Sequence, residues 1–301
     1  MNWANSLERS VRAPTALIAL TGLLWGTSFA SMKIGLQYVD PYSFAFLRLL
    51  AAFIFSAAIL FIFERPEVSM LRDRSIWALG VLNAGAFLLQ YVGLGYTTAT
   101  RTALIVNANV ALTALLSWKV YRESMGFGKL VALPLAIIGV FLLATGGDLT
   151  SLSGGQAIGD LLVFLAGIVW SFFLVLNKGV VSKREVNVPQ MVAWVMLVTA
   201  IAMIPTALLL GNVGRVPLPW EGWSAVAYTA LVCTAIPYLI FAKAQRFVTV
   251  TFSSLVLLIE VVVAIVSSTL ILGEHFALGS GLGAALVCGS IILASRGSAA
   301  G

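Results

Sequence analysis

Charged side chains are scarce in this chain: Asp, Glu, Lys and Arg together make up 10% of its 301 residues, against about 25% in soluble domains. Residues of the types AVILMFWYC make up 60%, and the mean hydropathy is +1.01. The alternating polar and apolar pattern of an outer-membrane barrel is absent. This composition indicates an all-α membrane protein with several spanning helices.

Histidine, cysteine and catalytic motifs are also scarce. His275 is the only histidine, and we place it in a turn beyond the middle of the membrane, away from any proton relay. Cys233 and Cys288 fall inside apolar runs, so neither a disulfide framework nor a metal site is expected. No G-x-x-x-x-G-K-[ST], H-E-x-x-H or G-x-S-x-G motif occurs, which argues against an ATP-driven pump and an intramembrane protease. We therefore expect no enzymatic activity, no cofactor and no metal.

Ten apolar stretches are long enough to cross a bilayer as helices, which takes about 20 residues at ~1.5 Å each. The first run is longer than the apolar core of a secretion signal, so we interpret it as a membrane helix. The small and polar stretch 147–156 is the predicted linker between two halves, 1–146 and 157–301. We predict spans at residues 13–37, 41–63, 75–97, 99–121, 127–146, 157–181, 188–211, 220–245, 249–272 and 276–296.

Lysine and arginine are distributed unevenly over the segments between the predicted spans. Of the 18 residues of these two types, fourteen fall on the side of the N-terminus, only Lys33, Arg101 and Arg215 fall on the other, and Arg48 lies within the second predicted span. The positive-inside rule therefore predicts cytoplasmic N- and C-termini in the inner (plasma) membrane. This bias also explains the net charge of +6 without a nucleic-acid partner.

The two predicted halves share one ground plan. Four pairs of residues coincide when the halves are superimposed with a shift of 151 or 145 positions: Glu274 with Glu123, Glu260 with Asn109, Trp25 with Trp170, and Lys33 with Lys178. Because each half holds an odd number of spans, the second half starts on the opposite side of the membrane. We therefore predict inverted repeats, as in many secondary transporters, with a substrate near the midplane between them.

Glu260 stands near the middle of an apolar span, where a charged side chain costs roughly 2.5–3.5 kcal/mol. It shares one helix face with Ser253 and Ser267, so that face should meet protein or water rather than lipid. Two interpretations stay open. Glu260 either couples transport to protons or binds a substrate ammonium group, or it is a structural partner of another polar group.

Polar and aromatic side chains mark possible cavity walls on two further spans. Asn83, Phe87, Gln90 and Tyr91 follow helical spacing on one face, and Asn107 poses the same choice on the next span. Lipid offers amides no partner. These side chains therefore either line a cavity or form hydrogen bonds between helices, at roughly 0.6–2 kcal/mol each.

Four further aromatic residues are candidates for substrate stacking. Trp25 and Trp170 lie too deep for an interface belt, so they either pack within the protein or stack against a substrate, and Tyr228 and Tyr238 pose the same alternative. The predicted substrate-binding residues are Trp25, Ser28, Asn83, Phe87, Tyr91, Asn107, Trp170, Tyr228, Tyr238, Ser253 and Ser254.

Two basic residues and one proline complete the candidates. Lys33 and Arg101 could meet a substrate carboxylate, and with Glu260 they form the predicted coupling or charge-partner set. Snorkelling to the membrane interface is the favoured alternative for both basic residues. Pro237 interrupts a span and is the predicted hinge, with plain helix curvature as the alternative.

Several segments together resemble the drug/metabolite transporter superfamily in its ten-span, two-domain EamA form. They are WGTSF at 25–29 followed by Lys33, FLRLLAA at 46–52, WKVYRE at 118–123, and IEVVVA…LILGE at 259–274. Within that superfamily the chain looks most like the aromatic amino acid exporters. The family often has proline after the acidic residue of the last segment, where this chain has Val261. We therefore expect a less broken helix at that point.

The residues and the resemblance together predict a secondary transporter that exports small amphipathic metabolites, most of all amino acids including aromatic ones, by alternating access. The predicted partners are a small-molecule substrate and the lipid bilayer, with a monomer as a plausible state. Other metabolites or drugs moved with protons are one alternative, and a membrane subunit without transport of its own is another. A lipid-modifying enzyme would need a catalytic constellation, and none is found.

Overall fold

The computed structural model describes residues 12–145, 147, 157–183, 186–213, 218–274 and 278–298. Within these residues all regular structure is helical, and no strand occurs. His275, Arg215 and nearly all of the predicted linker 147–156 lie outside the described residues.

Eight helical stretches are long and apolar enough to cross a membrane, which confirms a multi-pass membrane protein. Five of them are single helices: α2 (Arg12–Gly35), α3 (Pro41–Phe63), α4 (Arg74–Tyr96), α8 (Ala157–Val181) and α9 (Val188–Leu209). The other three consist of two pieces: α5 (Ala99–Asn107) with α6 (Val110–Tyr121), α10 (Trp220–Ala230) with α11 (Ile236–Gln245), and α12 (Val250–Leu257) with α13 (Ile259–Leu272).

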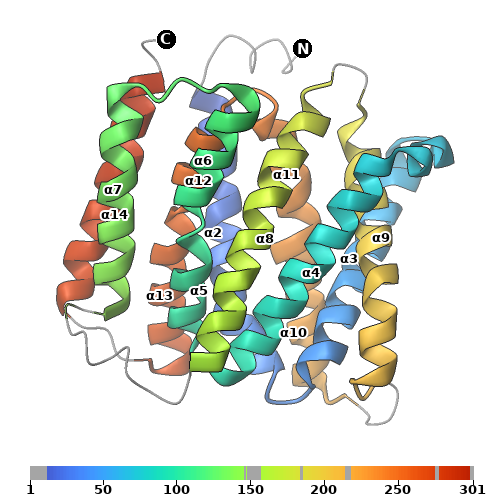
Figure 1. Ribbon diagram of the computed structural model, residues 1–301. Helices are drawn as coiled ribbons and strands as arrows, with labels where there is room; N and C mark the ends of the chain where they lie inside the picture. Colours follow the sequence, from blue (N-terminus) through green and yellow to red (C-terminus); the bar gives the residue numbers. More distant parts are fainter. Residues whose placement is uncertain are drawn as a thin grey trace.

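Two more helices, α7 (Phe127–Thr145) and α14 (Leu278–Ser298), occupy the predicted fifth and tenth spans. Their apolar parts are shorter, so the count of ten spans stays a prediction. The two helices stand side by side at the left edge of the molecule (Figure 1). They approach closely at Gly139 of α7, where a Cβ would lie only 3.0 Å from the Gly283 carbonyl oxygen of α14.

Local sequence sets several helix ends. The Asp40 carboxylate accepts from the backbone N–H groups of Tyr42 and Ser43, at 3.0 and 2.9 Å, and so caps α3. Asp73 caps α4 in the same way, and the hydrogen bond from the Ser75 N–H lowers the pKa of the Asp73 carboxyl group. A short 3₁₀ helix, η1 (Val68–Arg72), connects α3 to α4.

Two spans are interrupted where we predicted continuous helices over 99–121 and 249–272. α5 gives way to α6 at Ala108 and Asn109, and α12 gives way to α13 at Leu258. At the second break the Leu258 N–H bonds the Leu255 carbonyl three residues back, at 3.2 Å, in place of the usual four. The helix therefore breaks at Leu258 although Val261 stands where the family often has proline.

Close packing of two glycines accompanies these breaks. A Cβ on Gly22 of α2 would lie 3.3 Å from the carbonyl oxygen of Leu257, at the end of α12. A Cβ on Gly167 of α8 would lie 3.0 Å from the carbonyl oxygen of Val106, near the end of α5. Each interrupted span therefore meets the backbone of a glycine-bearing helix at its break.

The third interruption, in 220–245, is a π-helix, η3 (Leu231–Ala235). Pro237 has no N–H, so it cannot donate to the Cys233 carbonyl four residues earlier. The Arg48 Nη2 donates to that carbonyl oxygen instead, at 3.2 Å. Pro237, the predicted hinge, therefore lies where the helix is already distorted and is held by a side chain of α3.

Candidate functional site

A central cavity lies where the interrupted helices meet α2, α4 and α8. Its empty space is about 640 Å³, including the part that opens to the outside. The lining residues are Trp25, Ser28, Met32, Arg48, Phe87, Gln90, Val106, Asn107, Asn109, Trp170, Leu174, Tyr238, Ser254, Leu257 and Glu260.

The structure brings most of the predicted site residues to this cavity. Of the predicted substrate-binding and charge-partner residues, those that line it are Trp25, Ser28, Phe87, Asn107, Trp170, Tyr238, Ser254 and Glu260. They come from both predicted halves of the chain. Sequence reasoning missed the apolar lining residues Val106, Leu174 and Leu257, because nothing distinguishes them from residues that face lipid.

Asn83 and Tyr91 lie behind the cavity wall, although we predicted that they bind substrate. Asn83 donates from Nδ2 to the Thr199 hydroxyl at 3.1 Å and accepts from the Tyr238 hydroxyl at 2.5 Å. The Tyr91 hydroxyl accepts from Arg48 at 2.7 Å. Both side chains are fully buried. They position cavity residues rather than line the cavity.

Tyr228 and Ser253, also predicted to bind substrate, do not line the cavity either. Tyr228 is 38% exposed, and its hydroxyl donates to Thr27 at 2.9 Å. The Ser253 hydroxyl donates to the Val250 carbonyl of its own helix at 2.9 Å. A shared helix face with Glu260 did not reveal this, because the break at Leu258 separates the two residues.

Lys33 lies outside the cavity, at the end of α2. Its Nζ donates to the carbonyl oxygens of Leu94 and Thr97, at 2.9 and 2.7 Å, where α4 ends. These carbonyls lack helical partners. The ammonium group therefore caps α4 and does not face the cavity.

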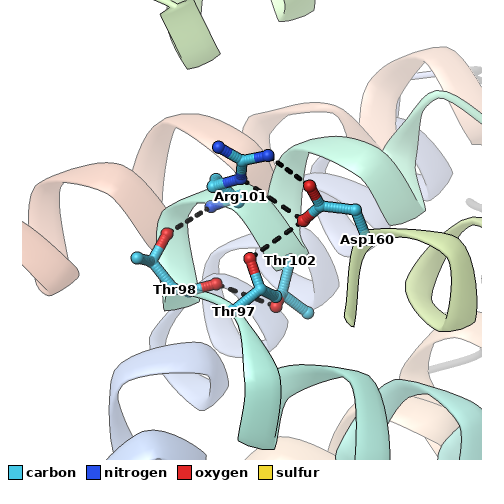
Figure 2. A network of polar contacts seen from close by, with 5 residues as sticks. All are labelled: Thr97, Thr98, Arg101, Thr102 and Asp160. Carbon is cyan, nitrogen blue, oxygen red and sulfur yellow. Dashed lines mark hydrogen bonds and ion pairs between the residues drawn. The ribbon is translucent and has the colours of Figure 1, made fainter. Parts of the chain in front are cut away.

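Arg101 likewise lies outside the cavity, in the network of Figure 2. Its guanidinium forms an ion pair with Asp160 near the start of α8. Asp160 also accepts from the Thr97 hydroxyl at 2.9 Å, and the Thr98 hydroxyl caps α5 through the Arg101 N–H at 3.1 Å. The Thr102 hydroxyl donates to the Thr98 carbonyl at 2.8 Å. This network joins the start of α5 to α8.

An arc of aromatic rings forms one side of the cavity. Trp25 contacts Tyr238 with ring centroids 5.6 Å apart, and Tyr238 contacts Phe173 at 5.9 Å. Phe173 contacts Trp170 at 5.4 Å, and Trp170 contacts Phe87 at 5.1 Å. All four contacts are edge-to-face, an arrangement favoured by the quadrupoles of the rings. Because Phe173 is buried behind them, the other four rings present the surface that a ligand meets.

Arg48 is held by the protein at the edge of this arc. Its Nε donates to the Thr234 hydroxyl at 2.8 Å, and its Nη1 donates to the Tyr91 hydroxyl at 2.7 Å and to the Met32 sulfur at 3.0 Å. Its guanidinium carbon lies 4.9 Å from the centroid of the Phe87 ring, a cation–π contact. With the bond to the Cys233 carbonyl, four of its five N–H donors have protein acceptors.

Glu260 lies in the first turn of α13 and is half-buried at the cavity. The side-chain amide of Asn107 lies beside its carboxyl group, and Arg48 acts on it electrostatically from farther away. Among the described residues, the only ion pair joins Arg101 to Asp160, so no basic side chain pairs with Glu260. The N-terminus of α13 favours the negative charge.

Two other carboxylates lie at the starts of helices, outside the cavity and at opposite ends of the molecule. The Glu274 carboxylate accepts from the N–H groups of Ala99 and Thr100 at the start of α5, each at 3.0 Å. The Glu123 carboxylate accepts from the N–H groups of Val250 and Thr251 at the start of α12, at 2.7 and 3.2 Å.

A lysine accompanies each of these carboxylates. Lys33 caps the end of α4 near Glu274, and the Lys178 Nζ donates to the carbonyl oxygens of Gln245 and Arg246, at 2.8 and 3.0 Å, where α11 ends. Each ammonium group interacts electrostatically with the carboxylate at its own end.

Comparisons with known proteins place this geometry among transporters. The family model described as the EamA-like transporter family matches residues 14–145 and 157–296. An uncharacterized transporter of Archaeoglobus fulgidus is 31% identical over 229 residues, which cover 75% of this chain and 77% of the relative. The uncharacterized transporter YyaM of Bacillus subtilis is 28% identical over 280 residues, which cover 90% and 89%.

One solved crystal structure shares the fold, with a TM-score of 0.76 at 17% sequence identity. The alignment covers 94% of this chain and 96% of that one.

Proposed function

The chain belongs to the EamA-like transporter family, and from this premise we propose that it is a secondary transporter that exports small amphipathic metabolites, most of all amino acids including aromatic ones, across the bacterial inner membrane. The cavity is the observation that carries the proposal. Both predicted halves line it together, with Trp25 and Asn107 among the residues from the first and Trp170 and Tyr238 among those from the second. Apolar walls with a few polar groups suit an amphipathic ligand.

Alternating access between two inverted repeats is the proposed mechanism. The paired contacts of Glu123 and Glu274 support it, because the two halves exchange equivalent carboxylate caps at opposite ends of the molecule. The parallel contacts of Lys33 and Lys178 support it in the same way. Movement about the cavity would open one end while the other stays closed.

We also propose ten spans with both termini in the cytoplasm. In Figure 1, α2 begins and α14 ends at the same end of the molecule, and α7 and α14 stand side by side along it. The distribution of Lys and Arg supports the orientation. We likewise propose that residues 147–156 link the two halves.

Counterflow of labelled phenylalanine into liposomes that contain only this protein tests the proposal. Wild-type protein should give saturable flux, and Trp25→Leu should lower the apparent affinity roughly tenfold, because it removes a ring from the cavity wall. Trp223→Leu is the matched control, since Trp223 is 50% exposed on α10 and lies outside the cavity. Absence of saturable flux across a broad panel of metabolites and drugs would favour a subunit without transport of its own.

Proton coupling through Glu260 is the proposed driving force, with facilitated flow as the alternative. The carboxyl group can release its proton when a ligand binds and recover it afterwards. Measuring flux at several pH values with wild type and Glu260→Gln separates the two. If the variant keeps the pH dependence of the wild type, Glu260 has no part in coupling.

A further inference from the structure

The charges of the cavity are arranged asymmetrically. Among the described residues that line it, Glu260 is the only carboxylic acid and Arg48 the only basic side chain. The two differ in how many of their polar interactions remain available to a ligand. Glu260 is half-buried and has an amide partner, but no described basic side chain pairs with it. Arg48 is only 2% exposed, and protein groups accept four of its N–H donors.

A ligand carboxylate would therefore gain little at Arg48. To reach the guanidinium in more than one place, it would have to displace Met32, Tyr91, Thr234 or the Cys233 carbonyl, all of which are buried. Displacing the last of these would remove a hydrogen bond from a buried carbonyl next to Pro237, and losing a partner is unfavourable for a buried polar group. Arg48 thus stabilises the π-helix η3 rather than binding the ligand.

A ligand cation meets the opposite situation. It would supply the charge that the Glu260 carboxylate lacks, and a charge pair in a water-poor cavity is stronger than one at a surface. Trp25, Trp170 and Tyr238 line the same cavity, and tryptophan and tyrosine faces attract cations. The face of Phe87 is less available, because Arg48 already occupies it.

We propose that Glu260 and the rings of Trp25, Trp170 and Tyr238 form an ammonium site, so that the cavity recognises the amine of an aromatic or apolar ligand and not its carboxylate. The inference rests on the proposed transport function and names the group of the ligand that is recognised. It extends the substrate class from amino acids to amphipathic primary amines. It also predicts that aromatic acids without an amine are poor ligands.

Three ligands of similar size test the proposal: phenylalanine, phenethylamine and 3-phenylpropionate. Each competes with labelled phenylalanine in counterflow. Phenethylamine should compete as well as phenylalanine, and 3-phenylpropionate at least about tenfold less well. Glu260→Gln should weaken competition by phenethylamine at least about tenfold. The matched control Glu221→Gln, at the exposed start of α10, should change nothing.

Ligand-dependent thermal stability in detergent gives a second measurement that needs no flux. A ligand that binds the folded state raises the unfolding temperature in proportion to ln(1 + [L]/Kd). Phenethylamine should raise it for wild type and Glu260→Asp, which keeps the charge, but not for Glu260→Gln. Wild type that unfolds no later with phenethylamine than with 3-phenylpropionate would overturn the proposal.

Two results separate this proposal from the transport function. If 3-phenylpropionate competes as well as phenethylamine, or if Glu260→Gln leaves competition by phenethylamine unchanged, the ammonium site is wrong although transport stands. If no ligand gives saturable flux, transport fails, and the thermal measurement still decides whether Glu260 binds an amine.

Discussion

Two junctions between helices, here called corners, are each held by a lysine and a glutamate. They share the same contacts with the backbone but differ in the side chains around them. The first corner is the α4–α5 junction, held by Lys33 and Glu274, and the second is the α11–α12 junction, held by Lys178 and Glu123. In both, an ammonium group binds the free carbonyls of one helix end, and a carboxylate binds the free N–H groups of the next helix start. Helix ends buried in a membrane need such partners.

The corners differ in the residue that precedes each carboxylate and in the contacts beside it. Gly273 precedes Glu274 and Arg122 precedes Glu123, both with positive φ, at 68° and 54°. Beside the first corner lies the Arg101–Asp160 ion pair, whose side chains are 14% and 19% exposed. Beside the second, the buried Asn177 amide donates to Gln245 at 2.7 Å. The unpartnered backbone groups at the helix ends therefore determine the contacts that both corners share. The neighbouring side chains do not serve those groups, so they differ between the corners.

Removing either carboxylate should have the largest effect. Glu274→Ala and Glu123→Ala each leave two N–H groups at a helix start without partners, at about 1–3 kcal/mol for each buried group. We expect both variants to unfold roughly 5–15 °C below wild type in detergent, as measured by thermal denaturation. Glu221→Ala, at an exposed position, serves as the control. A large fall for one corner with none for the other would contradict their equivalence.

The preceding residue should have a smaller effect, of opposite sign at the two corners. Gly273→Ala forces a Cβ into the left-handed region, at about 1–2 kcal/mol, and no atom lies within 4 Å of that Cβ to add a clash. Arg122→Gly should instead stabilise by up to about 1 kcal/mol, because it relieves the same conformation. Thermal denaturation of both variants checks the signs. Destabilisation by Arg122→Gly would mean that the arginine side chain matters more than its backbone.

Composition and hydropathy were sufficient for the general architecture. They give a multi-pass helical protein, and the predicted spans 41–63 and 157–181 have the bounds of α3 and α8, since proline and small polar residues mark their ends. The breaks at Ala108 and Leu258 could not be predicted, because neither carries a proline or glycine. They accompany close contacts with Gly167 and Gly22, which are distant in sequence.

The candidate cavity was predictable only in part, for a similar reason. A polar or aromatic side chain in mid-span indicates that a helix face meets protein, which applies equally to Phe87 and Asn83. Only the packing decides that Phe87 lines the cavity while Asn83 lies behind it, bonded to Thr199 and Tyr238. Arg48 lines the cavity, but its charge in mid-span does not mark a ligand-binding group. Its guanidinium donates to the π-helix before Pro237, which leaves few N–H groups for a ligand.

The smallest expected effect concerns the contacts beside the corners. Asp160→Asn removes a partly exposed ion pair, worth roughly 0.2–1 kcal/mol, and the loss should shrink as salt rises from about 0.05 to 0.5 M, because the Debye length falls. Asn177→Ala removes a neutral, buried hydrogen bond, so its loss should stay the same across that range. Unfolding temperatures of wild type and both variants at several salt concentrations provide the measurement. An Asp160→Asn difference that does not respond to salt would mean that the charge pair is not what ties α8 to the first corner.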